Sequence, residues 1–189
     1  MVSTTLNRRR WMDVLKNRWP AALAIGPWAL TLGGGEADGA VGGLGEALLL
    51  LPLPYLIIAK FLRRGLSWPI LVVGLTATVV LRGLDVVAPS AVFVAVALIT
   101  LVWGAVDGQL HRPGELRVQA LGWVGFAALA LAGLAVDPDL GRHLVAAGWF
   151  FHGVWDFVHL WRDKVVARSY AEWCGLVDIL IAAELVFLS

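Results

Sequence analysis

The sequence is poor in charged residues and in cysteine, and it lacks the polar surface that a soluble domain needs. Only 15% of the 189 residues are charged, whereas 59% are hydrophobic. A soluble domain carries about 25% charged and about 45–50% apolar residues. A soluble fold of this length cannot bury so much apolar surface, because roughly a third of the surface of its chain stays exposed. These shortages exclude a soluble enzyme, a disordered tail and a nucleic-acid-binding domain, and they predict a polytopic membrane protein.

Other absences narrow the chemistry. The single cysteine, Cys174, can form no internal disulfide and builds no thiolate metal site. The net charge of +1 gives no field that recruits nucleic acid. The chain has no Gly-rich nucleotide loop, no His-x-x-His-His run of the kind that membrane di-iron oxidases use, and no lysine in its last apolar segment to bind retinal. The expected partners are the lipid bilayer and a lipophilic small molecule, without nucleic acid.

Apolar segments separated by Gly, Pro, Arg and Asp predict one all-α domain, residues 1–189, with about seven membrane spans. About 20 residues are enough to cross a bilayer. Pro52 and Pro54 predict a kink inside the second span. The first span is short and follows a basic start, so it could instead be a signal peptide. It could also be a re-entrant segment, and the chain would then have six spans. The expected spans are residues 20–33, 44–62, 67–87, 90–110, 117–136, 142–161 and 171–188.

The distribution of basic residues predicts the orientation. With a cytoplasmic N-terminus, thirteen Lys and Arg residues fall on the cytoplasmic side, and only Arg82 and Arg142 fall on the other. Short cytoplasmic loops carry an excess of Lys and Arg, so this bias predicts a multi-pass protein of the plasma (inner) membrane with its N-terminus inside. In the fifth span, Gly122 and Gly125 give a small-residue face that suits either packing within the bundle or a homo-oligomer interface.

Ionisable side chains inside predicted spans each cost a few kcal/mol or more, so they mark candidate sites. His152, Asp156 and His159 follow the spacing i, i+4, i+7 and share one face of a helix. The same i, i+4 spacing recurs at the end of the fourth span, and one further aspartate lies in the last span at a similar depth. The candidate catalytic residues are Asp156, His152, His159, Asp178 and Asp107.

These residue types are suited to binding a metal. Neutral imidazole and carboxylate groups hold zinc or a similar divalent ion. The candidate ligands of one such ion are His152, Asp156, His159, His111 and Asp107, with Asp178 at the same depth. Without a metal, the same groups can run general acid–base chemistry or relay protons. A polar network that only locks the bundle is the structural alternative.

A second group of polar residues is expected toward the opposite membrane face. Arg82 and Asp85 are expected to pair at i, i+3, and Glu46 is expected to begin the second span. The group is either structural or the outer half of a pathway. It comprises Glu46, Arg82, Asp85, His143 and Glu184. Trp103, Trp149 and Trp155 do not fit an interfacial belt, and either pack in the bundle or line an apolar cavity.

The last quarter of the chain carries a longer pattern, His152-x-x-Trp155-Asp156-x-x-His159 followed by Arg168-Ser169-Tyr170-x-Glu172-x-Cys174-x-x-x-Asp178. It resembles a pattern in small bacterial membrane proteins without an assigned activity. In outline the chain is also similar to seven-span ceramidase-like hydrolases, which use intramembrane His and Asp around zinc. It is similar in outline to integral membrane terpene cyclases as well, whose carboxylates protonate the substrate. That likeness implies such a role for Glu46, Asp178 or Glu184.

Together these patterns favour an intramembrane enzyme that acts on a lipophilic substrate at a buried His/Asp site. The reaction would be metal-assisted hydrolysis or acid-initiated cyclisation. The alternatives are a proton-coupled transporter or small-molecule-binding protein, and a structural or assembly subunit.

Overall fold

The structure, a computed structural model, describes the backbone of residues 18–31 and 37–187 and the side chains of residues 18–25 and 41–187. The basic start, with Arg8, Arg9, Arg10 and Lys16, lies outside the described residues. Within them all regular structure is helical, as the composition predicts. The helices are α2 (Trp19–Thr31), α3 (Ala37–Leu50), α4 (Leu53–Phe61), the short 3-10 helix η1 (Arg64–Leu66), α5 (Ser67–Leu84), α6 (Pro89–Val106), α7 (Glu115–Ala135), α8 (Pro138–Arg162) and α9 (Arg168–Phe187).

Four segments of the described chain are long and apolar enough to cross a membrane: Val41–Phe61, Arg64–Leu84, Pro89–Val106 and Glu115–Ala135. This supports the prediction of an all-helical membrane protein. The predicted first span forms only the 13-residue α2, which at 1.5 Å per residue is about 20 Å long, shorter than a hydrocarbon core of about 30 Å. Helices α8 and α9 are long enough, but they carry more ionisable residues than the four apolar segments do.

The second predicted span is bent at its prolines. Helix α3 ends at Leu50 and α4 begins at Leu53, with a turn at Leu51 and Pro52 between them. Pro52 and Pro54 have no backbone N–H to donate to the carbonyls one turn earlier, so the helix breaks here. The predicted kink is confirmed. Helix α3 already begins at Ala37, before the predicted start of the span at residue 44, because glycine is well tolerated in membrane helices.

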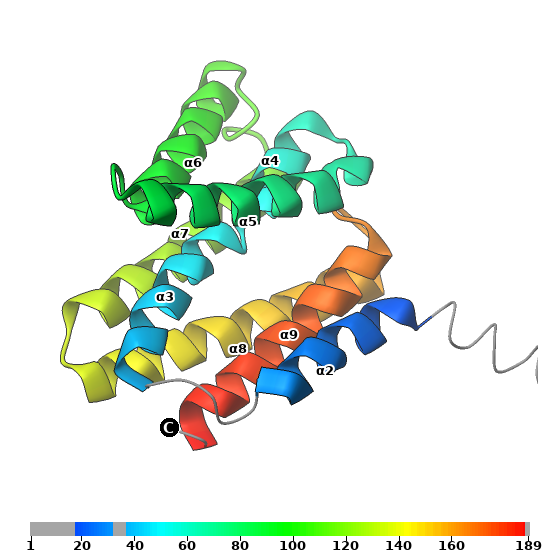
Figure 1. The fold of residues 1–189 in the computed structure, drawn as a ribbon. Coiled ribbons are helices and arrows are strands. Elements are labelled where there is room, and N and C mark those ends of the chain that lie inside the picture. The colour runs from blue at the N-terminus through cyan, green and yellow to red at the C-terminus, as the bar shows by residue number, and fades with distance from the viewer. Residues whose placement is uncertain (1–17, 32–36, 188–189) are drawn as a thin grey trace, which may run out of the picture.

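Helices α8 and α9 pack lengthwise against each other and form the base of the bundle (Figure 1). Helix α7 packs on α8, α2 covers α9, and α3 contacts both α7 and α8. Helices α5 and α6 lie at the periphery, where α5 exposes Val72, Val73 and Val79. An exposed apolar face of this kind suits contact with lipid. The two glycines of the predicted small-residue face of α7 have different surroundings. Gly122 packs against the Trp155 ring, and Gly125 faces open space.

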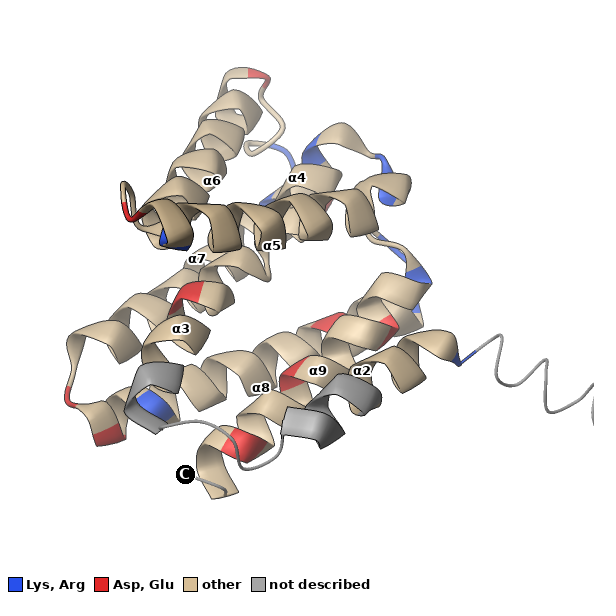
Figure 2. Cartoon of the chain, in the orientation of Figure 1, with Lys and Arg blue, Asp and Glu red and all other residues tan. Residues whose placement is uncertain are grey.

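The two ends of the bundle differ in charge (Figure 2). At one end the α4–α5 loop, the start of α7 and the α8–α9 loop meet, where Arg64 pairs with Asp163 and Lys164 pairs with Glu115. We call this the basic end. At the other end, the last turn of α5 and the start of α6 meet α3 around the Arg82–Glu46 ion pair.

Candidate functional site

Two glycines allow α8 and α9 to approach closely at the level of the ionisable residues. A Cβ atom added to Gly153 of α8 would lie 3.2 Å from the Cβ of Asp178, and one added to Gly175 of α9 would lie 3.3 Å from the Cβ of Asp156. His152 and Asp156 are one helical turn apart on α8, so they present both side chains to the same strip of α9. This contact brings His152, Asp156 and Asp178 into one cluster, which we call the His/Asp cluster.

The three side chains of the His/Asp cluster interact directly. His152 Nδ1 lies 2.7 Å from Asp178 Oδ2 and 3.4 Å from Asp156 Oδ2. The shorter distance is that of a hydrogen bond from Nδ1–H to Asp178, because a carboxylate is a strong acceptor for an imidazole N–H. Each residue also offers one ligand atom within 4.8 Å of the other two. The cluster therefore has the compactness of a metal site.

All three residues are completely buried, yet each has a polar atom without a hydrogen-bond partner among the described residues. These atoms are His152 Nε2, Asp156 Oδ2 and Asp178 Oδ1. A buried polar atom left unsatisfied costs about 1–3 kcal/mol, and a charged one costs more. Three such atoms in one cluster are unusual for a network that only locks a bundle, since such networks are normally satisfied. These atoms are free to contact a ligand.

The only two tyrosines of the chain both contact this region. The Tyr55 hydroxyl of α4 donates a hydrogen bond to Asp156 Oδ1. Its ring centroid lies 5.9 Å from that of His152 and 6.0 Å from that of Tyr170. The Phe126 ring also packs edge-on against His152, with ring centroids 4.9 Å apart. Tyr55 is not among the residues predicted from the sequence, although a tyrosine next to the kink of an apolar span is a signal that could identify it.

His159 shares the helix face but belongs to a different hydrogen-bonded circuit. Its Nδ1 lies 2.8 Å from the Trp155 carbonyl oxygen, and its Nε2 lies 2.9 Å from Gln119 Nε2. Trp155 Nε1–H in turn donates to Gln119 Oε1 at 3.3 Å. Together these contacts describe a neutral His159 with the proton on Nδ1 and with both ring nitrogens satisfied. The structure therefore does not bring the predicted ligand His159 into the His/Asp cluster.

Asp107 and His111 also lie outside the cluster. Asp107 accepts a hydrogen bond from the buried Lys60 ammonium, which lies 4.9 Å from the centre of the Trp103 ring. His111 is exposed. Asp107 lies at the C-terminal end of α6 and His111 lies in the loop that follows it. Of the predicted residues, the structure brings together His152, Asp156 and Asp178, and it does not bring Asp107 or His111 to them.

The second predicted cluster is rearranged. Arg82 Nη2 donates to Glu46 Oε2 at 2.7 Å rather than to Asp85. Asp85 terminates α5 in the left-handed conformation, with φ 50°, so the i, i+3 geometry of a continuous helix does not apply. Glu46 lies within α3 and not at its start. His143 bonds its own helix through the Asp139 carbonyl, and Glu184 is half-buried on α9.

The three tryptophans expected near the site have separate roles. Trp155 holds Gln119 and packs on Phe126, so it lies beside the His/Asp cluster. Trp149 is buried and donates to the Leu44 carbonyl oxygen. Trp103 is half-exposed and packs on Phe61. Trp149 and Trp155 therefore pack within the bundle, and Trp103 makes a cation–π contact with Lys60. The three side chains contact different neighbours among the described residues.

No protein-family model, curated protein or solved structure matches this chain. The chemistry of the site therefore has to be argued from its own geometry.

Proposed function

We propose that this chain is a multi-pass enzyme of the plasma (inner) membrane that acts on a lipophilic substrate by metal-assisted hydrolysis. The His/Asp cluster would hold one divalent metal ion, zinc or a similar one. The observation that carries the proposal is the set of three completely buried polar atoms, one on each residue, without a hydrogen-bond partner among the described residues. An ion bound to the two carboxylates removes a penalty that packing alone leaves in place.

The charge of the cluster favours a divalent cation. With His152 neutral and both carboxyl groups ionised, the cluster carries two negative charges. Among the described residues, no Lys or Arg side chain is paired with either carboxylate. Buried charge without a partner is costly, so it has to be compensated. One divalent cation brings the sum to zero, and its binding matches the known preference of such ions for imidazole and carboxylate ligands.

The neighbouring side chains would orient the ligands. The atoms of the cluster that lie closest together, His152 Nδ1 and Oδ2 of both carboxylates, would be the metal ligands, and the imidazole proton would then be on Nε2. Tyr55 holds Asp156 through Oδ1 and leaves Oδ2 available. A divalent ion at this position would supply Lewis-acid activation of a carbonyl or phosphoryl oxygen.

A metal-free variant of the proposal is supported by the closeness of the two carboxyl groups. In this variant, two protons replace the metal ion and compensate the two negative charges of the cluster. One proton is on His152, and the other is shared by Asp156 and Asp178. One oxygen of each carboxyl group lies within 4.8 Å of the other and of a His152 ring nitrogen. A carboxyl group that keeps its proton beside a second carboxylate can act as a general acid. Acid-initiated cyclisation of a polyprenyl-type substrate would follow from this form of the site.

The basic end is proposed to face the cytoplasm. The seven proposed spans are the four apolar segments together with α2, α8 and α9. The described loops at this end carry Arg63, Arg64, Arg112, Arg162 and Lys164, and the opposite end carries Arg82 and Arg142. The positive-inside bias supports this orientation.

The experiment compares the wild-type protein with Asp156→Asn, which keeps the volume of the side chain and removes its charge. Membranes containing each protein are incubated with a lipid extract, and the products are identified by mass spectrometry. Loss of a metal ligand or of an acid–base group should lower product formation by about 10²–10⁴-fold. Asp85→Asn, at an exposed helix end, is the matched control and should behave like wild type.

Identical product profiles for wild type and Asp156→Asn would contradict the proposal that the chain is an enzyme. If only the flux of an unchanged cargo across proteoliposome membranes differed, the protein would be a transporter. If neither chemistry nor flux differed, the cluster would be a packing network.

A further inference from the structure

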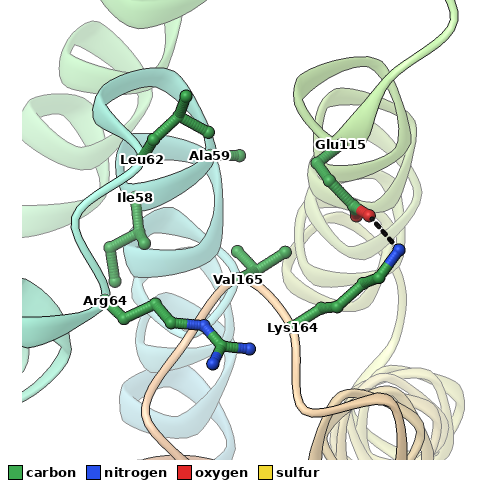
Figure 3. A pocket seen from close by; sticks show the side chains of 7 residues that line it. All are labelled: Ile58, Ala59, Leu62, Arg64, Glu115, Lys164 and Val165. Atoms are coloured by element: carbon green, nitrogen blue, oxygen red, sulfur yellow. Dashed lines mark hydrogen bonds and ion pairs between the residues drawn. The ribbon is translucent and has the colours of Figure 1, made fainter.

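A cavity of about 340 Å³ opens at the basic end, between the end of α4, the start of α7 and the α8–α9 loop (Figure 3). One part of its wall is apolar, and Leu62 at its rim is 78% exposed. The other part carries three charged side chains. The lining residues are Ile58, Ala59, Leu62, Arg64, Glu115, Lys164 and Val165.

The cationic groups of the cavity are only weakly engaged by the protein. Lys164 Nζ lies 3.3 Å from Glu115 Oε1, and Arg64 Nη1 lies 3.4 Å from Asp163 Oδ1. Both pairs are long and partly exposed, and exposed ion pairs of this kind contribute only about 0–1 kcal/mol. The Arg64 guanidinium and the Lys164 ammonium can therefore turn to a ligand at little cost. With Glu115 included, the lining has a net charge of +1, which matches the single negative charge of a phosphodiester.

Two walls of the cavity lie one helical turn from polar residues that pack near the His/Asp cluster. On α4, Ala59 is one turn beyond Tyr55, and on α7, Glu115 is one turn before Gln119. The third wall is the loop that follows His159, and Ile58 of the cavity belongs to the same buried cluster as Tyr55 and Tyr170. The cavity therefore lies about one helical turn from Tyr55, the residue of α4 that contacts the His/Asp cluster.

The loop wall is held in an uncommon backbone conformation. Val165 has φ 67°, a left-handed value that is a true outlier for a β-branched residue. Such a conformation costs about 1–3 kcal/mol and is found where a binding site is shaped by the surrounding structure. It keeps Lys164 and Val165 at the cavity wall.

We propose that this cavity binds the phosphate headgroup of an anionic phospholipid, and that such lipids are the substrate class of the His/Asp cluster. The inference rests on the proposed function for its second half. The phosphate would contact Arg64 and Lys164, and the acyl chains would leave past the exposed Leu62 into the bilayer. Basic pockets between membrane helices on the cytoplasmic side are a known way of holding anionic headgroups.

The test titrates the purified full chain in neutral detergent with dioctanoyl phosphatidylglycerol and follows bound lipid by native mass spectrometry. The variant Arg64→Gln/Lys164→Gln should bind about fivefold more weakly for each cation removed. Arg63→Gln/Arg162→Gln removes the same charge from exposed positions that do not line the cavity and should bind like wild type. Glu115→Gln should bind more tightly, because it frees Lys164 and removes a repulsive carboxylate.

Equal losses in the cavity variant and in the Arg63/Arg162 control would overturn the cavity as the site and indicate general attraction to the basic end. Inorganic phosphate that competes as well as the lipid would overturn the lipid as the ligand. Asp156→Asn should bind the lipid normally, while its product formation falls by about 10²–10⁴-fold. If Asp156→Asn fails to change chemistry while the cavity variants lose lipid, the enzyme proposal fails and the headgroup site stands.

Discussion

Replacing Tyr55 by phenylalanine removes one oxygen atom from the centre of the bundle and tests the account at one defined contact. The hydroxyl donates the hydrogen bond that Asp156 Oδ1 receives, and Asp156 Oδ2 already lacks such a partner among the described residues. After the substitution neither oxygen of a buried carboxylate accepts a hydrogen bond. A hydrogen bond to a charged group contributes about 1.5–3 kcal/mol. Tyr55→Phe should therefore lower the free energy of unfolding by about 2 kcal/mol, which corresponds to a folding equilibrium constant that is about 30-fold smaller.

The matched control is Tyr170→Phe. Tyr170 is as deeply buried and its ring packs against that of Tyr55, but its hydroxyl meets no nitrogen or oxygen partner among the described residues. Removing that hydroxyl should leave stability nearly unchanged. Both variants are unfolded reversibly in mixed detergent micelles by titration with a denaturing detergent, and the midpoints are compared with wild type. Equal midpoints for the two variants would refute the reasoning, because they would mean that Asp156 does not depend on the hydrogen bond from Tyr55.

Three further predictions follow from other parts of the structure. Val165 has φ 67°, a backbone conformation that favours glycine. Val165→Gly should therefore be more stable than Val165→Ala by about 1 kcal/mol. The reverse order in thermal unfolding would contradict the assignment of backbone strain to this loop. Gly141→Ala should destabilise the α7–α8 hairpin, because the new Cβ would lie 2.4 Å from the Gly133 carbonyl oxygen; an unchanged unfolding midpoint would show that the helices are free to separate. A cysteine at Gly65 in a Cys174→Ala background should react with a membrane-impermeant reagent only from the cytoplasmic side, and labelling only from outside would reverse the orientation.

Much of the helical framework was predictable from the sequence, because apolar segments of span length and their breakers are local signals. The bend at Pro52 and Pro54 follows from two missing backbone donors and needs no knowledge of the neighbouring helices. The start of α3 was missed, since the stretch around Gly42 and Gly43 carries the composition of a loop although it is helical.

The site was predictable only in part, since its assembly depends on how helices face one another. The i, i+4 spacing of His152 and Asp156 identifies one helix face, and the depth of Asp178 identifies a plausible partner. Depth alone equally selected Asp107, which in the structure pairs with Lys60 from another helix. Tyr55 reaches Asp156 across 101 residues of sequence, and no periodicity within one helix carries that information.

The most direct test of the central claim is the metal content of the purified full-length protein and of two histidine variants, measured by elemental analysis after purification without chelator and supplementation with zinc. The account predicts about one divalent ion for each wild-type chain, loss of the ion in His152→Ala, and retention in His159→Ala, whose ring nitrogens are already bound to Trp155 and Gln119. Wild-type protein that binds no ion, or an ion lost in His159→Ala and kept in His152→Ala, would contradict the assignment of the His/Asp cluster as the metal site.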